Sequence, residues 1–189
     1  LIVTGVQTCA LPILLNYYRI VTLTEDDLDL IKGGPEERRL FVDQAIVLED
    51  ADFVILSKRC KDIVENRNAL LKRGASLDSY QLWTEQLWQV TSQIQDSRIK
   101  MLAQLEQAVQ ALVRAYFNNE FTIAFSYQPK KASYSSFSEF TQHHASLYAD
   151  EQRFGRSLFG AHLDDFSIHF KDAKSKSFAS RGQQKLIVL

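Results

Sequence analysis

The stretch Ser180-Arg-Gly-Gln-Gln-Lys185, close to the C-terminus, decides how the chain is interpreted. It follows a short apolar and charged alternation that ends at Phe178, and it leads into the apolar run 186–189. A small-residue loop that opens a helix can hold a phosphate, because its backbone N–H groups are unpaired and Gly182 permits close approach. The same Ser-x-Gly pattern is also an ordinary N-cap and turn. Taken alone, the hexapeptide is more often a turn than a nucleotide site, so the rest of the chain must decide.

The first thirteen residues differ in character from everything that follows. Residues 3–13 read VTGVQTCALPI, which one reading frame of a common sequencing-adaptor oligonucleotide encodes, and they carry no charge. A secretory signal would need a basic start and a small-residue cleavage site, which this stretch lacks. We therefore treat 1–13 as a non-native artefact. Because Leu189 falls inside an apolar run without a cap, we expect an internal fragment of a longer chain.

Composition narrows the class of protein. A hydrophobic content of 46% and a charged content of 24% are typical of a soluble globular protein and exclude disordered and collagen-like chains. The sequence has no apolar run of the length of a membrane span. Only Cys60 remains outside the excluded segment, so we expect a reducing, cytoplasmic setting without disulfides or a cysteine zinc site. A net charge of −1 means that nucleic-acid binding would have to come from local basic patches.

The segment 14–35 predicts a strand followed by a short helix. Residues 17–23 are β-branched and aromatic, and Thr24 is an N-cap for a helix that Gly33 and Gly34 end. Pro35 suits the first turn of the next helix, which carries Arg38 and Arg39. Adjacent arginines normally form a solvated face or pair with nearby acids. The more specific alternative is that they contact phosphate or an acidic partner.

Residues 36–118 predict a helical arm. A helix over about 52–72 is basic at its end, at Arg67, Lys72 and Arg73, which suits the helix dipole, and Gly74 stops it. The longest helix runs over about 78–118. The spacing of its core positions alternates between four and three, with one extra step of four that resembles a stutter. These positions are Trp83, Leu87, Val90, Ile94, Arg98, Met101, Leu105, Ala108, Leu112 and Ala115. So wide a stripe favours packing within one chain, and a plain helix bundle fits equally well.

The pattern changes in the last segment, 119–189. Residues 121–128 alternate like a strand, 136–154 predict a helix, and 166–170 predict a half-buried strand before a hairpin loop at Asp172-Ala173-Lys174. Adjacent residues on a helix point apart, and neither His143 nor His144 has an acid or histidine at i+4. We therefore expect surface or boundary histidines there and no metal site.

The residues with candidate chemistry are His162, Asp164 and Asp165. Paired carboxylates beside a histidine suit metal binding or acid–base work, and they equally suit turn and cap positions. The sequence has no Gly-x-x-x-x-Gly-Lys-Ser/Thr loop, so these residues cannot form a complete ATPase site. The last stretch is locally basic, with Lys171, Lys174, Lys176, Arg181 and Lys185.

The order of these parts resembles the RecF family of bacterial replication and repair proteins, which have an ABC-type ATPase head and a helical arm. Five stretches carry the resemblance: Thr24–Leu28 with Gly33–Asp43, Glu65–Lys72, Asp78–Arg98, Arg153–Phe166 and Ser180–Lys185. They span nearly all of residues 20–189 in the family's order. The chain departs from the family pattern at Ala161, Leu163 and Lys185, where the family has proline, arginine and arginine.

The resemblance implies an α/β fold class, an α+β piece of an ABC-type head with an inserted arm. It divides the chain into head (14–35), helical arm or lid (36–118) and returning head (119–189). Ser180, Gly182 and Gln183 would be signature residues that close on ATP held by a second subunit, and His162, Asp164 and Asp165 would form a head-site loop. The phosphate loop and the Mg²⁺-holding aspartates would lie outside the chain. The parent protein would be a weak DNA-dependent ATPase, and we expect the isolated chain to be inactive.

The resemblance also implies partners. An ATP-dependent homodimer would bind DNA at single-strand/double-strand junctions or gaps and act with RecR and RecO to load RecA, in DNA repair, recombination and the SOS response. Arg38, Arg39, Lys130 and Lys131 are candidates for contact with DNA phosphates. The alternatives are a piece of another SMC-like coiled-coil ATPase and a helical interaction module without a nucleotide role.

Overall fold

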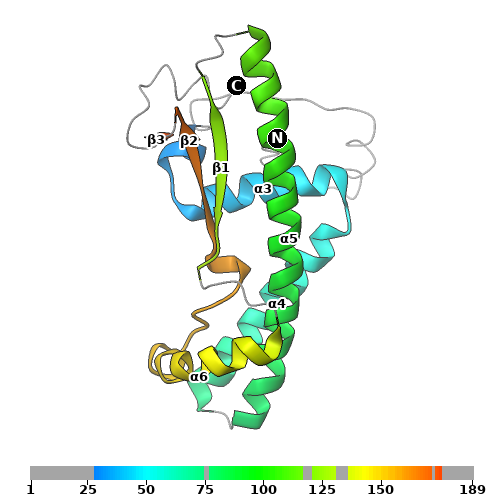
Figure 1. The fold of residues 1–189 in the computed structure, drawn as a ribbon. Coiled ribbons are helices and arrows are strands. Elements are labelled where there is room, and N and C mark those ends of the chain that lie inside the picture. Colours follow the sequence, from blue (N-terminus) through cyan, green and yellow to red (C-terminus); the bar gives the residue numbers. More distant parts are fainter. Residues whose placement is uncertain (1–27, 75–76, 117–120, 131–135, 172, 176–189) are drawn as a thin grey trace.

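The computed structural model describes residues 28–74, 77–116, 121–130, 136–171 and 173–175 (Figure 1). The predicted strand over 17–23, Lys131 and the stretch 180–185 lie outside the described residues. The helices are α2 (Asp29–Lys32), α3 (Pro35–Glu49), α4 (Phe53–Arg73), α5 (Leu77–Tyr116), α6 (Phe137–Phe154) and the 3-10 turn η2 (Ala161–Leu163). The strands are β1 (Ile123–Gln128), β2 (Asp165–Phe170) and β3 (Ala173–Lys174).

A small antiparallel sheet and a set of helices make up the fold. Figure 1 shows α5 running along the whole molecule, with the sheet beside its C-terminal half and α6 beside its N-terminal end. α4 packs along α5, and α3 crosses behind α5 and the sheet and contacts both α5 and β2. The mixed composition confirms the predicted α/β class. Across the described residues, every helix is too short or too polar to cross a bilayer.

Local signals set the helix ends as predicted. α3 begins with Pro35, and the Glu37 carboxylate accepts a hydrogen bond of 2.8 Å from the backbone N–H of Gly34. α6 begins after Ser136, whose hydroxyl oxygen accepts from the N–H of Glu139 at 3.2 Å. Gly74 and Gly155 end α4 and α6 with φ of 63° and 62°, the left-handed conformation that glycine adopts most easily. The predictions of these boundaries are confirmed.

The buried stripe of α5 follows the predicted positions only in its first part. Leu87, Val90, Ile94 and Met101 are buried, as predicted. Nearer the C-terminus the prediction is wrong, because Ala108 and Leu112 are exposed and Val113 is buried instead. A straight helix drifts relative to a seven-residue repeat, and the partner of α5 changes from α4 to β1 along its length.

The sheet has the order β1-β2-β3, and both pairs are antiparallel. Phe166, Ile168 and Phe170 are buried and alternate with half-buried residues, which confirms the predicted strand. The predicted hairpin loop is wrong at Ala173 and Lys174, because these two residues pair with Phe170 and His169. The chain therefore reverses within fewer residues than the sequence pattern indicated.

Side chains of α5 close the outer edge of β1. The backbone N–H of Ile123 donates to Gln110 Oε1 at 3.0 Å, and that of Phe125 donates to Glu106 Oε2 at 2.7 Å. Gln110 Nε2 in turn donates to the Phe121 carbonyl at 3.1 Å. The helix thus supplies the hydrogen bonds that a further strand would otherwise make.

Candidate functional site at the junction of helices and sheet

The chain enters β2 through two consecutive aspartates. Gly160, with φ of 121°, leads into the 3-10 turn η2, and Asp164 follows it in an extended conformation. Asp165 is the first residue of β2. This local geometry points the two carboxylates toward different partners. We call the two aspartates and the residues bonded to them, together with the Arg98–Asp43 pair, the junction cluster.

Asp164 connects three elements through hydrogen bonds. Its side chain accepts from Gln95 Nε2 at 2.7 Å, from the Tyr127 hydroxyl at 2.7 Å and from the Lys130 backbone N–H at 2.8 Å. Its carbonyl accepts from Arg39 Nη1 at 2.7 Å. Burial, together with the negative charge of Asp164, raises the pKa of the Tyr127 hydroxyl. Because only 1% of Asp164 is exposed, these bonds are internal to the protein.

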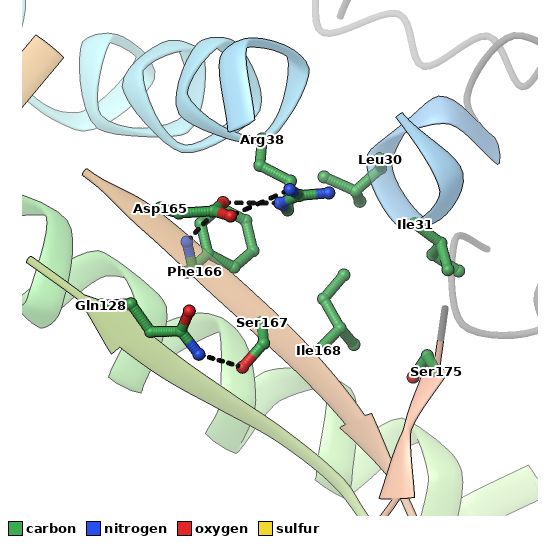
Figure 2. A pocket seen from close by; sticks show the side chains of 9 residues that line it. All are labelled: Leu30, Ile31, Arg38, Gln128, Asp165, Phe166, Ser167, Ile168 and Ser175. Atoms are coloured by element: carbon green, nitrogen blue, oxygen red, sulfur yellow. Dashed lines mark hydrogen bonds and ion pairs between the residues drawn. The ribbon is translucent and has the colours of Figure 1, made fainter. Parts of the chain in front are cut away.

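Asp165 forms a two-pronged ion pair with Arg38. Arg38 Nε lies 2.7 Å from Oδ1 and Nη2 lies 3.0 Å from Oδ2, and Nη1 donates to the Gly33 carbonyl at 3.0 Å. Figure 2 shows this pair at one side of a cavity of about 130 Å³ between α2, α3 and the sheet. Charge-assisted pairs of this geometry fix orientation as well as contributing energy. The pair therefore fixes α3 against the start of β2.

Arg98 makes a third connection. Its Nε and Nη2 donate to the Asp43 carboxylate at 2.7 and 2.9 Å, and its Nη1 donates to the Ala161 carbonyl at 2.7 Å. Burial lowers the pKa of this guanidinium, but the hydrogen bond and charge of Asp43 more than offset it, so the pKa stays above its ordinary value. The sequence placed Arg98 at a core position, but pattern alone did not identify its partner.

His162 lies beside this cluster without joining it. Its Nδ1 is buried and has no hydrogen-bond partner among the described residues. Burial, and next the charge of Arg39, lower the pKa of its imidazole to about 4. His162 is therefore neutral at pH 7.

The cluster has the geometry of a structural junction. Within the described residues, no group of three or more His, Cys, Asp or Glu side chains is placed to hold a metal. The carboxylate oxygens of Asp164 and Asp165 already accept hydrogen bonds from protein donors. Of the two alternatives weighed for His162, Asp164 and Asp165, this arrangement favours the turn and cap roles.

The structure brings together some of the predicted phosphate-binding residues. Arg38 and Arg39 lie in the junction cluster with their guanidinium groups bonded to β2 and the turn before it. Lys130 is exposed, and only its backbone N–H joins the cluster. Lys131 and the signature candidates Ser180, Gly182 and Gln183 lie outside the described residues. Phosphate contact by these residues stays a prediction.

The structure contains a second polar cluster, which the sequence did not predict. Arg67, interpreted from sequence only as a favourable charge near a helix end, is fully buried and ion-paired with Glu151 at 2.6 Å. Its Nη1 also donates to Ser157 Oγ at 2.7 Å, and its guanidinium carbon lies 4.2 Å from the centroid of the Tyr80 ring. The Tyr80 hydroxyl donates to the same Glu151 carboxylate. We call Arg67, Glu151 and the residues bonded to them the arm cluster.

His144 belongs to the arm cluster, so its prediction as a surface or boundary residue is wrong. It is 9% exposed, with Nε2 at 3.0 Å from Glu151 Oε2 and 3.1 Å from Arg67 Nη2. Its acid partner, Glu151, lies seven residues further along α6, which is two helical turns. The sequence prediction considered only partners one turn away, at i+4, and therefore missed it. Burial raises the pKa of Glu151, but hydrogen bonds from His144 and Arg67 outweigh burial and lower it to about 2.

We expect the protein to lose stability as the pH falls below 6.5. The folded-state pKa of His162 is about 4, below the ordinary histidine value of 6.5, so the unfolded state binds more protons in this window. The stabilisation is complete above pH 6.5 and is lost as the pH approaches 4, by at most about 3 kcal/mol. Glu151 adds a second loss between pH 4.5 and about 2.

Urea unfolding at pH 7, 5.5 and 4.5 measures this dependence. His162→Asn, which cannot take up a proton, should remove the decline between pH 6.5 and 4. An unchanged decline in that variant would contradict the assignment to His162.

Comparison with known proteins agrees with this fold. No protein-family model matches the chain. The DNA replication and repair protein RecF of Geotalea daltonii is 31% identical over 179 residues, which are 92% of this chain and 49% of that protein. The protein of the same name from Acholeplasma laidlawii is 31% identical over 174 residues, 90% of this chain and 48% of that protein. The chain thus spans about half the length of the curated relatives it matches.

Two solved structures share the fold. A structure of the recombination mediator protein RecF with ATP, described in the RecFOR pathway, superposes with a TM-score of 0.77 at 19% identity. The match covers 88% of this chain and 47% of that chain. A structure of the same mediator with an ATP analogue gives a TM-score of 0.78, also at 19% identity. At this identity, the likeness shows the fold alone.

Proposed function

We propose that the chain is part of an ATP-dependent DNA repair protein, because it belongs to the RecF family. It spans about half the length of the curated members that it matches. The relatives are named for DNA replication and repair, and a solved relative is named for its complex with ATP. In this proposal the division into head (14–35), arm (36–118) and returning head (119–189) is retained.

One observation carries the proposal. Stretches that resemble the family in sequence are held together in space by charged pairs. Arg38 of the first stretch pairs with Asp165 of the fourth, and Asp43 of the first pairs with Arg98 of the third. Arg67, in the second stretch, pairs with Glu151, two residues before the fourth begins. The resemblance therefore falls on residues that maintain the arrangement of the fold, and not only on scattered apolar positions.

The finer proposal concerns the nucleotide. Ser180, Gly182 and Gln183 would close on ATP bound to a second subunit, since small residues and a glycine allow backbone N–H groups to reach phosphate oxygens. The resulting homodimer would bind DNA at single-strand/double-strand junctions or gaps. By the resemblance it would act with RecO and RecR and load RecA, with Mg²⁺ and weak DNA-dependent ATPase activity supplied by the parent protein.

We expect Ser180→Arg, in the family-length protein, to weaken ATP-dependent dimerisation and binding to gapped DNA at least about tenfold. A long cationic side chain would fill the space that the nucleotide needs at the signature. Sedimentation with and without ATP, and fluorescence anisotropy with gapped DNA, measure the two effects. Ser177→Arg is the matched control, because it adds the same side chain three residues earlier.

If Ser180→Arg leaves both activities intact, the signature assignment is wrong. If the DNA affinity of the wild-type protein is the same with and without ATP, the alternative of a helical interaction module without a nucleotide role is favoured instead.

A further inference from the structure

Two helices end side by side at the end of the molecule opposite the sheet (Figure 1). Asn68 Oδ1, near the end of α4, accepts from the Ser157 N–H at 2.7 Å and from its hydroxyl at 2.8 Å. A Cβ added to Gly155, which ends α6, would lie only 3.2 Å from Lys72 Cγ of α4. The last turns of α4 and α6 therefore form one continuous surface.

This surface is strongly basic. Four cations are exposed here: Lys72 and Arg73 of α4, Arg153 of α6, and Arg156 just after α6. In the part of the chain that the structure describes, no acid lies within ion-pair distance of any of these four cations. The two acids nearest in sequence to Arg153 are Glu151, which is buried and paired with Arg67, and Asp150, which is exposed and forms no ion pair with it.

An exposed aromatic ring lies beside one of these cations. Phe154, the last residue of α6, is 56% exposed. The Arg153 guanidinium carbon lies 5.7 Å from the centroid of its ring. We call Lys72, Arg73, Arg153, Phe154 and Arg156 the arm-end patch.

Helix dipoles explain only part of the patch. Cations in the last turn of a helix are favourable, which accounts for Lys72, Arg73 and Arg153. Arg156 lies beyond the end of α6, and the exposure of Phe154 has no dipole benefit. Proteins that bind single-stranded nucleic acid combine cations along the backbone with exposed aromatic rings on which bases stack, and the end of the arm offers both.

We propose that the arm-end patch binds single-stranded DNA, with the four cations on backbone phosphates and the Phe154 ring stacked on an unpaired base. The proposal rests on the DNA-binding function proposed above and assigns that function a surface outside the junction cluster and the signature. A paired base offers no open face to Phe154, so the aromatic contribution is specific for single strands.

The test uses the family-length protein and a fluorescent oligothymidine, with a blunt duplex as the second probe. A variant with Lys72, Arg73, Arg153 and Arg156 all changed to Gln should bind the oligothymidine at least about tenfold more weakly, and the slope of log K against log salt should fall by about 3. The matched control changes Lys58, Arg59, Lys100 and Arg114 to Gln. These four cations are also exposed, and their loss alters the net charge equally.

Phe154→Ala isolates the stacking contribution. It should weaken oligothymidine binding about tenfold and leave duplex binding unchanged. Equal losses in the patch and control variants would overturn the proposal, because the effect would then follow total charge. An equal loss of duplex and oligothymidine binding in Phe154→Ala would overturn the single-strand assignment.

The two proposals fail differently. If wild-type protein with ATP binds neither these two probes nor gapped DNA, the proposed function fails. If wild-type protein binds and the patch variant binds equally well, only the arm-end patch is refuted.

Discussion

Replacing Arg67 with methionine is expected to lower the free energy of unfolding by about 3–5 kcal/mol. Methionine fills the volume but leaves the Glu151 carboxylate, which is fully buried, without its cation. It also leaves the Ser157 hydroxyl without the 2.7 Å hydrogen bond that it accepts from Arg67 Nη1. Removing one partner of a buried ion pair costs more than the pair itself contributes, because the remaining charge is desolvated without compensation.

Urea denaturation followed by circular dichroism measures this loss. Arg73→Met is the matched control, since it removes an exposed arginine from the same helix and should change stability by no more than about 0.5 kcal/mol. Glu151→Gln in the Arg67→Met background should restore part of the loss, because a neutral amide is cheaper to bury than a carboxylate. Equal effects of Arg67→Met and Arg73→Met would refute a structural role for the arm cluster.

The second large effect is expected at Asp164. Asp164→Asn keeps the shape of the side chain but turns one acceptor oxygen into an N–H₂ group. That group must then face either the Lys130 N–H or the donors of Gln95 and Tyr127. Two donors facing each other in a buried site cost about 2–3 kcal/mol, so the free energy of unfolding should fall by that amount.

Two further variants test this explanation. Asp150→Asn, at an exposed position, should change stability by no more than about 0.5 kcal/mol. Tyr127→Phe removes one of the donors and should partly relieve Asp164→Asn in the double variant, which a double-mutant cycle detects. Strict additivity of the two changes would contradict a shared hydrogen-bond network.

The sequence predicted local secondary structure correctly wherever a single residue determines the backbone conformation. Pro35 and Gly74 each mark a helix end through their own conformational preferences, and the structure confirms both. The predicted helix over 136–154 likewise matches α6. The alternation of β2 was equally readable, because one face of that strand is buried and the other is not. These signals depend on neighbours within four residues.

The polar clusters depend on partners far apart in the chain, and single-sequence patterns do not show such partners. Arg98 and Asp43 are separated by 55 positions, and Arg67 and Glu151 by 84. An arginine within an apolar stripe was the available signal for Arg98, since a buried guanidinium requires a buried acid. For Arg67 the sequence pattern had an ordinary explanation, an exposed cation near the end of a helix, and this explanation gave no reason to expect that the side chain is buried.

The covered edge of β1 limits how the sheet can be extended. An open strand edge is a template for pairing with other chains, and natural proteins protect such edges from aggregation. Gln110 and Glu106 occupy the outward N–H groups of Ile123 and Phe125, so that edge cannot accept a neighbouring strand without displacing α5. Among the described strands, growth of the sheet is therefore directed to the outer side of β3. A strand that extends this sheet would therefore have to pair with β3 and not with β1.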